Sequence, residues 1–243
     1  MAARVAAFSG GKEQAFATPG RLLRRLDITP GQTAAHGVDL AQGNPIKMLF
    51  GKGYALQTGL LWIIFFCSLL NLFLFAYWLP EVLHLIGMTP AQAARTSSFR
   101  EGGAIVAVLY LGVLIDRFGP ERSLAWHFAA GIAFIAAIAL VSMPDLLLTG
   151  AIFFAGMTIV GSQTGANAAC GKLYPARMRT SGLGWALGVG RLGGIAAPVL
   201  GGYLLRSGRP PTHIFLSACL FALLAAIATG LLAFRGSRAA AQN

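Results

Sequence analysis

Six long apolar segments follow one another along most of the chain and are separated by short polar stretches. Each runs for more than 20 residues, which is enough to cross about 30 Å of hydrocarbon at ~1.5 Å per residue in a helix. We therefore predict an all-α membrane protein with six transmembrane helices. The predicted helices cover residues 59–79, 95–115, 123–143, 146–171, 181–205 and 213–234.

The limits of the first two predicted helices depend on a few residues. The first helix holds no charge and is predicted to end at Trp78 and Pro80, an interfacial aromatic residue followed by a helix stop. The uncharged part of the second, residues 102–115, is only 14 residues long and is too short to cross the membrane. The second helix must therefore begin earlier and carry Arg100 and Glu101 inside the membrane region.

Composition supports this class of protein. The 243 residues are 56% hydrophobic and only 11% charged, which is typical of polytopic membrane proteins and not of soluble domains. Three cysteines lie in apolar runs without a C-x-x-C pattern, so we expect neither a metal site nor a disulfide framework. No H-E-x-x-H pattern or recognisable Ser/His/Asp arrangement occurs, so we predict that the chain is not an enzyme and needs no cofactor.

The net charge of +11 indicates membrane orientation better than nucleic-acid binding, because the basic residues lie at the ends of apolar segments. If the N-terminus is cytoplasmic, 14 of the 19 lysines and arginines fall on the cytoplasmic side and three on the other, while Arg100 and Arg191 lie within helices. We therefore expect both termini in the cytoplasm and a location in the inner membrane.

The chain divides into three parts by composition. Residues 1–53 are polar, glycine-rich and basic, without the apolar core of a signal peptide, and are predicted to be a partly disordered cytoplasmic segment. Residues 54–235 form the predicted six-helix domain, and residues 236–243 form a short cytoplasmic tail.

Two sequence patterns carry a family resemblance. In the first, small and polar residues are spaced closely from Gly161 to Gly202, around Arg191; they include Gln163, Asn167, Tyr174, Pro175, Arg179, Gly190, Pro198 and Gly202. The second is the run from Gly112 to Arg122, GVLIDRFGPER. Together they resemble the tenth and eleventh helices and the second-half loop motif of the aromatic acid/proton symporters, which belong to the major facilitator superfamily.

The resemblance covers roughly residues 45–235, which correspond to the second half of such a carrier. It implies half of a major facilitator fold, made of an inverted repeat of three plus three helices. It also implies alternating access, with a small aromatic carboxylate and a proton as the transported species. Residues 1–53 are similar to the linker between the two halves, and a separate N-terminal six-helix half is an expected partner beside the lipid bilayer.

Four residues are candidates for the substrate cavity. Arg191 either binds the carboxylate of an anionic substrate or is a structural charge held by an acidic neighbour, for which Glu101 is the candidate at a compatible depth. Gln163 and Asn167 share one helix face and either line the cavity or bond neighbouring helices. Glycines Gly190, Gly194 and Gly202, together with Pro198, make a stripe that permits close helix packing.

Four further residues are candidates for an inner gate. The Asp116 carboxylate can accept hydrogen bonds from a neighbouring helix start or from Arg177 or Arg179. The resemblance implies a gating role for Asp116, Arg117 and Arg122. The alternative is a solvated turn whose charges serve only to orient the protein.

The remaining polar and aromatic residues within the spans have simpler interpretations. We interpret His127 as a packed or interfacial histidine and not as a proton carrier, since no intramembrane acid is near it in sequence. Most members of the aromatic row on the first helix are expected to face lipid; this row is Phe65, Phe66, Phe73, Phe75 and Tyr77. The competing hypothesis for the whole chain is a membrane module that binds partners without transport, or an inactive fragment of a transporter.

Overall fold

A computed structural model of the chain describes residues 49–51 and 53–240. Within these residues it contains six helices, each long and apolar enough to cross a membrane, which confirms the predicted fold class. The helices are α5 (Ala55–Leu85), α6 (Pro90–Phe118), α7 (Pro120–Leu140), α8 (Asp145–Leu173), α9 (Ala176–Arg206) and α10 (His213–Ala240). The expectations for nearly all of residues 1–53, and for the last three residues of the tail, lie outside the described residues.

Most helix ends differ from the predicted ones, and two of these differences have a local explanation. Helix α5 continues through Pro80 to Leu85, so the predicted stop at Pro80 is wrong. A proline removes one backbone donor, and transmembrane helices tolerate this loss when the rest of the helix is held by its neighbours. Helix α6 begins at Pro90, where the Thr89 hydroxyl accepts from the Gln92 N–H (3.3 Å) and the Gln92 side chain accepts from the Thr89 N–H (3.0 Å). This capping box explains the earlier start.

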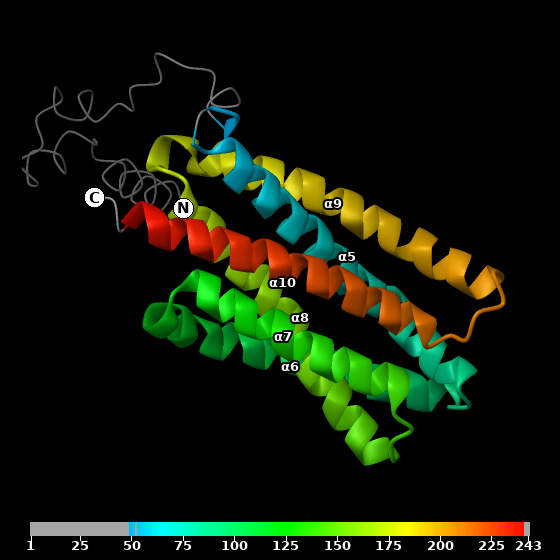
Figure 1. Ribbon diagram of the computed structural model, residues 1–243. Coiled ribbons are helices and arrows are strands. Elements are labelled where there is room, and N and C mark those ends of the chain that lie inside the picture. The colour runs from blue at the N-terminus through cyan, green and yellow to red at the C-terminus, as the bar shows by residue number, and fades with distance from the viewer. Residues whose placement is uncertain (1–48, 52, 241–243) are drawn as a thin grey trace, which may run out of the picture. The chain divides into compact units, whose positions relative to one another are not determined.

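The helices pack as two groups of three: α5 lies between α9 and α10, and α8 packs on α6 and α7 (Figure 1). Helix α6 packs on α8 as α9 packs on α5, and α7 packs on α8 as α10 packs on α5. Exchanging α5, α6 and α7 for α8, α9 and α10 therefore leaves the list of main neighbours unchanged, which supports the predicted 3+3 arrangement. Helices α6 and α9 lie at opposite edges and bury only 22% of their spans, against 61% for α5.

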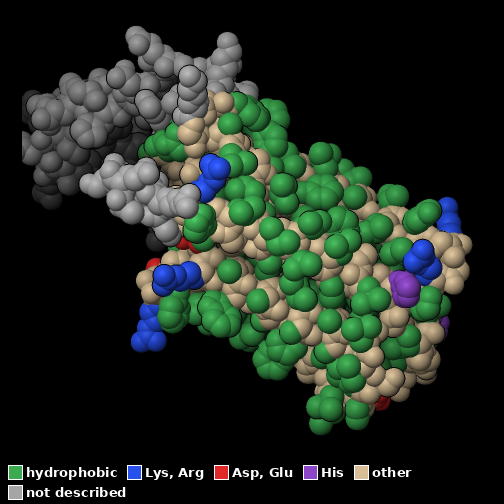
Figure 2. All heavy atoms as spheres, in the orientation of Figure 1, with side chains coloured by type: hydrophobic (Ala, Val, Ile, Leu, Met, Phe, Trp, Pro, Cys, Tyr) green, Lys and Arg blue, Asp and Glu red, His purple; other side chains and the backbone are tan. Residues whose placement is uncertain are grey.

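The surface has the distribution expected of a membrane-spanning bundle. On the face shown in Figure 2, lysine and arginine side chains gather at the two ends, and hydrophobic side chains cover the surface between them. Such an apolar band is stable when it faces lipid.

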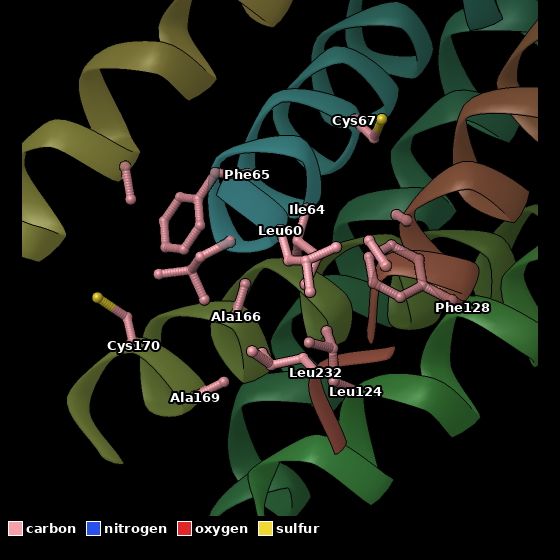
Figure 3. Close-up of a cluster of buried hydrophobic side chains, with 14 of the residues drawn as sticks. Leu60, Ile64, Phe65, Cys67, Leu124, Phe128, Ala166, Ala169, Cys170 and Leu232 are labelled. Atoms are coloured by element: carbon pink, nitrogen blue, oxygen red, sulfur yellow. The ribbon is translucent and has the colours of Figure 1, made fainter. Parts of the chain in front are cut away.

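The interior is formed by two clusters of buried apolar side chains. In the first cluster, residues from α5, α7, α8 and α10 point toward one another, among them Phe65, Phe128 and Leu232 (Figure 3). Phe65 and Phe75 are fully buried, and the Phe75 ring lies 5.0 Å from that of Phe215 on α10. The expectation that most of this aromatic row faces lipid is therefore wrong for these two residues, while Tyr77 is exposed.

Glycines permit the closest helix contacts. A Cβ at Gly103 of α6 would overlap the Phe153 carbonyl of α8, and one at Gly193 of α9 would overlap the Phe66 carbonyl of α5. The stripe on α9 that meets α5 consists of Gly190, Gly193, Gly194 and Gly201. It is rotated from the predicted stripe, because Pro198 is exposed and Gly202 makes only ordinary contact.

We predict that Gly103→Ala destabilises the bundle by about 1–3 kcal/mol, the range for inserting a group into a closely packed interface. Gly112→Ala, on the same helix, is the matched control, since a Cβ there would meet nothing within 4 Å. The control should be neutral or stabilised by up to about 1 kcal/mol, because alanine is the better helix former. Reversible unfolding in mixed micelles measures both; equal free energies of unfolding would contradict the close α6–α8 contact.

Candidate functional site

The two adjacent charges in the interior of α6, Arg100 and Glu101, pair with each other. The guanidinium of Arg100 forms an ion pair with the neighbouring Glu101 carboxylate, so the expectation that Glu101 pairs with Arg191 is wrong for this structure. The aliphatic part of Arg100 lies against Gly156 of α8 and is largely buried, whereas the Glu101 side chain is 61% exposed. Packing of the arginine stem on α8 thus brings its head group back to the adjacent carboxylate.

Arg191 is exposed on α9 and has no ion-pair partner among the described residues. Gly188, three residues earlier, has open space where a side chain would lie, while the other glycine of this face, Gly194, is filled by the Phe73 ring at 2.6 Å. Ile195 is 66% exposed. Of the two glycines on this face, only Gly188 therefore leaves space beside the Arg191 guanidinium for a ligand or a neighbouring side chain.

The two polar residues of α8 have unequal environments. Gln163 is half-buried, and its side-chain oxygen has no hydrogen-bond partner among the described residues, whereas Asn167, one turn further, is exposed. A buried amide oxygen without a donor is costly, so this group can accept a hydrogen bond from a substrate or a water. Within the described residues, neither side chain forms a hydrogen bond to a neighbouring helix.

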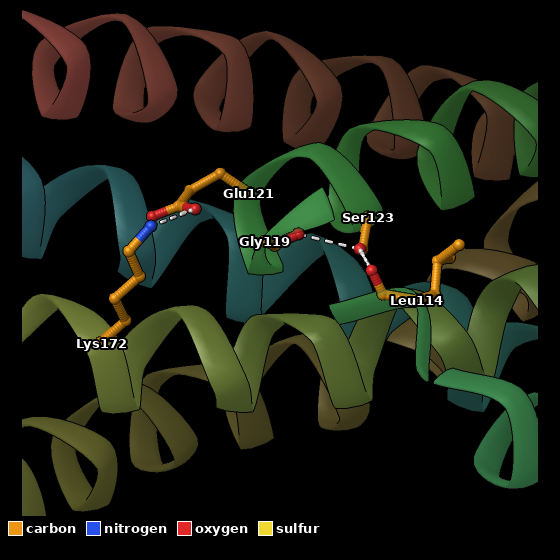
Figure 4. A network of polar contacts seen from close by, with 5 residues as sticks. All are labelled: Leu114, Gly119, Glu121, Ser123 and Lys172. Carbon is orange, nitrogen blue, oxygen red and sulfur yellow. Dashed lines mark hydrogen bonds and ion pairs between the residues drawn. The ribbon is translucent and has the colours of Figure 1, made fainter. Parts of the chain in front are cut away.

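The loops at one end of the bundle are tied by an ion pair that we did not predict. Lys172 of α8 lies 2.9 Å from Glu121 in the first turn of α7 (Figure 4). The turn between α6 and α7 needs Gly119, whose φ is +81°, and the Ser123 hydroxyl donates to the Gly119 carbonyl at 2.8 Å. The α6–α7 and α8–α9 loops therefore lie at the same end, as predicted.

The predicted gate residues lie at this end but are not paired. Asp116, Arg117, Arg122 and Arg179 are all exposed, and none forms an ion pair within the described residues. The expected ion pair between the Asp116 carboxylate and Arg179 is therefore not formed among the described residues, and the Arg177 side chain, the other expected partner, lies outside them. The link runs through Glu121 and Lys172, and an exposed pair of this kind contributes at most about 1 kcal/mol.

Tyr174 fixes the corner before α9. It is buried, and its hydroxyl donates to the Thr58 hydroxyl of α5 (2.9 Å), which in turn donates to the Leu49 carbonyl (3.0 Å). Burial raises the pKa of Tyr174 above its ordinary value, so the donor stays protonated. Its ring occupies the space beside Gly182, where a Cβ would lie 2.5 Å from the ring. This corner therefore fixes the position at which α9 begins, and α9 in turn carries Arg191.

The bundle interior also holds polar groups that sequence reasoning missed. Asn71 of α5 is 3% exposed, and its side-chain oxygen has no hydrogen-bond partner in the part of the chain that the structure describes. The Ser68 hydroxyl lies 3.5 Å from that of Ser162 on α8. In the sequence, these groups could have been found as single polar residues within apolar runs. His127 is buried and hydrogen-bonded, in line with its interpretation as a packed histidine.

The cysteines are free. Cys67 and Cys170 are buried and Cys219 is half-buried. Among the described residues, no three histidine, cysteine or acidic side chains come together in a way that could hold a metal ion.

Comparison with known proteins gives consistent relatives. A gallate transporter from Pseudomonas putida is 35% identical over 185 residues, which are 76% of this chain and 41% of that protein. A 3-(3-hydroxy-phenyl)propionate transporter from Escherichia coli is 32% identical over 195 residues, 80% of this chain and 48% of that protein. A gentisate transporter from Corynebacterium glutamicum is 35% identical over 168 residues, 69% of this chain and 37% of that protein. The chain spans less than half the length of these relatives.

These relatives confirm the resemblance drawn from the two sequence patterns, and they are transporters and not enzymes, as predicted. The profile of the Major Facilitator Superfamily matches residues 61–243, which include five whole helices and most of α5. The chain therefore belongs to the Major Facilitator Superfamily and is a multi-pass membrane protein.

Proposed function

We propose that this six-helix unit forms one half of a proton-coupled carrier that moves aromatic carboxylates across the inner membrane. The observation that carries the proposal is Arg191, an exposed arginine within a membrane span that has space beside it and no ion-pair partner among the described residues. The names of the relatives, which refer to gallate, gentisate and a hydroxyphenylpropionate, support the substrate class.

The exposed charges need a covering surface. Arg191 and Glu101 lie on α9 and α6, the two helices that bury least in this unit. A charge near the middle of a bilayer costs at least ~2.5 kcal/mol, so these faces are unstable against lipid. A second six-helix unit that closes a water-filled cavity over α6 and α9 removes this cost, and alternating access then follows from rocking of the two units.

The side chains suit a planar anion. A guanidinium can bind a carboxylate through two parallel hydrogen bonds, which a lysine ammonium cannot reproduce. The unpaired oxygen of Gln163 can accept from a ring hydroxyl, and the exposed amide of Asn167 can accept or donate. In this proposal Arg191 supplies affinity and the two amides select among hydroxylated rings.

The proposed gate lies at the cytoplasmic end. Asp116, Arg117 and Arg179 form no ion pair within the described residues, while Glu121 and Lys172 are joined. We propose that these three charges pair with the second unit in another conformation, so that the contact alternates during transport.

A chimaera tests the function. Residues 54–235 replace the second six helices of the gallate transporter, and uptake of labelled gallate and benzoate is measured in cells. We expect uptake that a protonophore abolishes, whereas this chain expressed alone should give none. A well-expressed chimaera that binds no aromatic acid would favour a membrane module without a transport role.

We predict that Arg191→Lys in the chimaera weakens the apparent affinity for aromatic acids about tenfold, the cost of losing one hydrogen bond to a charged group. Its thermal unfolding should not change, since the guanidinium makes no ion pair within the described unit. Arg206→Lys, near the end of the same helix, is the control and should keep the parent affinity. If Arg191→Leu alters only stability and not affinity, Arg191 is structural.

We also predict that both termini are cytoplasmic. A cysteine at Ser207, between α9 and α10, should react with an impermeant maleimide in intact spheroplasts, whereas one at Lys172 should react only after permeabilisation. The native Cys67 and Cys170 are buried and should not react with the maleimide before or after permeabilisation. Labelling at position 207 only after permeabilisation would reverse the topology.

A further inference from the structure

An apolar groove runs along the outside of the bundle between α6, α7 and α8. It has a volume of about 380 Å³, and its walls include Tyr110, Leu114 and Phe118 of α6, Trp126 and Phe134 of α7, and Met157 of α8. Trp126 is 67% exposed and Phe118 is 50% exposed, so the groove opens to the outside of the bundle near the α6–α7 turn.

The polar groups in the groove wall are already satisfied. Nδ1 of His127 lies 2.7 Å from the Ser123 carbonyl, which can only accept, so this nitrogen carries the proton. Nε2 is then an acceptor, and the Tyr110 hydroxyl donates to it at 2.5 Å. Thr158 donates to the Ala155 carbonyl at 2.9 Å. A histidine, a tyrosine and a threonine can therefore line this groove without needing a polar ligand.

A basic hollow borders the groove at Trp126. A second hollow of about 260 Å³ is lined by Arg122, Ala125, Trp126 and Ala129, so Trp126 borders both. Arg122 is exposed and has no ion-pair partner within the described residues. From Arg122 to Phe134 the helix rises about 18 Å, close to the ~15 Å depth of one leaflet. The surface thus matches one lipid molecule in length and in the order of charged and apolar parts.

The groove faces away from the proposed partner unit. Tyr110 follows Glu101 by nine residues, which places the two about half a turn apart on α6. If the Glu101 side meets the second unit, as the proposed function requires, the Tyr110 side faces lipid. The orientation of the groove therefore rests on the proposed function, while the groove itself does not.

We propose that this surface is a binding site for an anionic phospholipid, with the phosphate at Arg122 and one acyl chain along the groove from Trp126 to Phe134. Charge complementarity at Arg122 and the apolar walls select this occupant over a free anion, which would leave the groove empty. A zwitterionic lipid would fill the groove but lacks the net negative charge that Arg122 favours.

Tryptophan quenching by brominated lipids tests the proposal. The purified chain is placed in phosphatidylcholine vesicles that contain increasing mole fractions of a brominated lipid. In one series this lipid is acyl-brominated phosphatidylglycerol, and in the other it is acyl-brominated phosphatidylcholine. The quenching that is lost in Trp126→Phe is the contribution of Trp126. We expect the phosphatidylglycerol to quench Trp126 at about fivefold lower mole fraction, the preference that one cation near an anionic lipid gives.

Arg122→Gln should abolish this preference, and it should not disturb folding because Arg122 is exposed. Arg235→Gln, an exposed arginine in the last part of α10, is the control and should retain the preference. Equal quenching by the two lipids in the parent chain, or an unchanged preference in Arg122→Gln, would overturn the proposal. The readout contains no transport step, so a failed carrier assay and a failed lipid assay are distinguishable.

Discussion

A cation inside a membrane span is the constraint on which this structure depends. A guanidinium in hydrocarbon is unstable by several kcal/mol on most scales, so a helix that carries one must face water, an anion or another protein. Arg191 meets none of these within the described unit, and Glu101 meets only its neighbour Arg100. Both lie on the two helices that the bundle buries least. The exposed faces of α6 and α9 therefore carry the charges that the proposed second unit would cover, and the remaining helices hold these faces in place.

Small residues determine how these helices are held. Helices in lipid gain no hydrophobic free energy from meeting each other, so close backbone approach at glycines supplies the contact. Gly103 brings α6 onto α8, and Gly190 and Gly193 bring α9 onto α5. Tyr174 then anchors the start of α9 through Thr58 of α5. The position of Arg191 therefore follows from the packing of the adjacent glycine stripe of α9 on α5.

Much of this arrangement could be predicted from sequence, because lipid admits only spans of sufficient length and leaves charge at their ends. Details that depend on how each helix is rotated about its own axis could not be predicted. Helix α5 is apolar on all sides, so its sequence does not tell that Phe65 and Phe75 face inward. Residues i and i+1 on a helix point apart, and only the packing of the Arg100 stem on Gly156 lets it reach Glu101. Likewise, the turn at Gly119 decides that Glu121 rather than Asp116 meets α8.

The central claim is that the Arg191 side of α9 faces water in the assembled carrier. The most direct measurement is thiol labelling of Gly188→Cys, a position with open space three residues from Arg191, in membranes where residues 54–235 are paired with the first six helices of a relative. Leu224→Cys on the apolar surface of α10 is the comparison. The account predicts that a hydrophilic reagent labels position 188 and not 224, and that an aromatic carboxylate slows the reaction at 188. Equal resistance of both positions to labelling would show that this side faces lipid and would contradict the account.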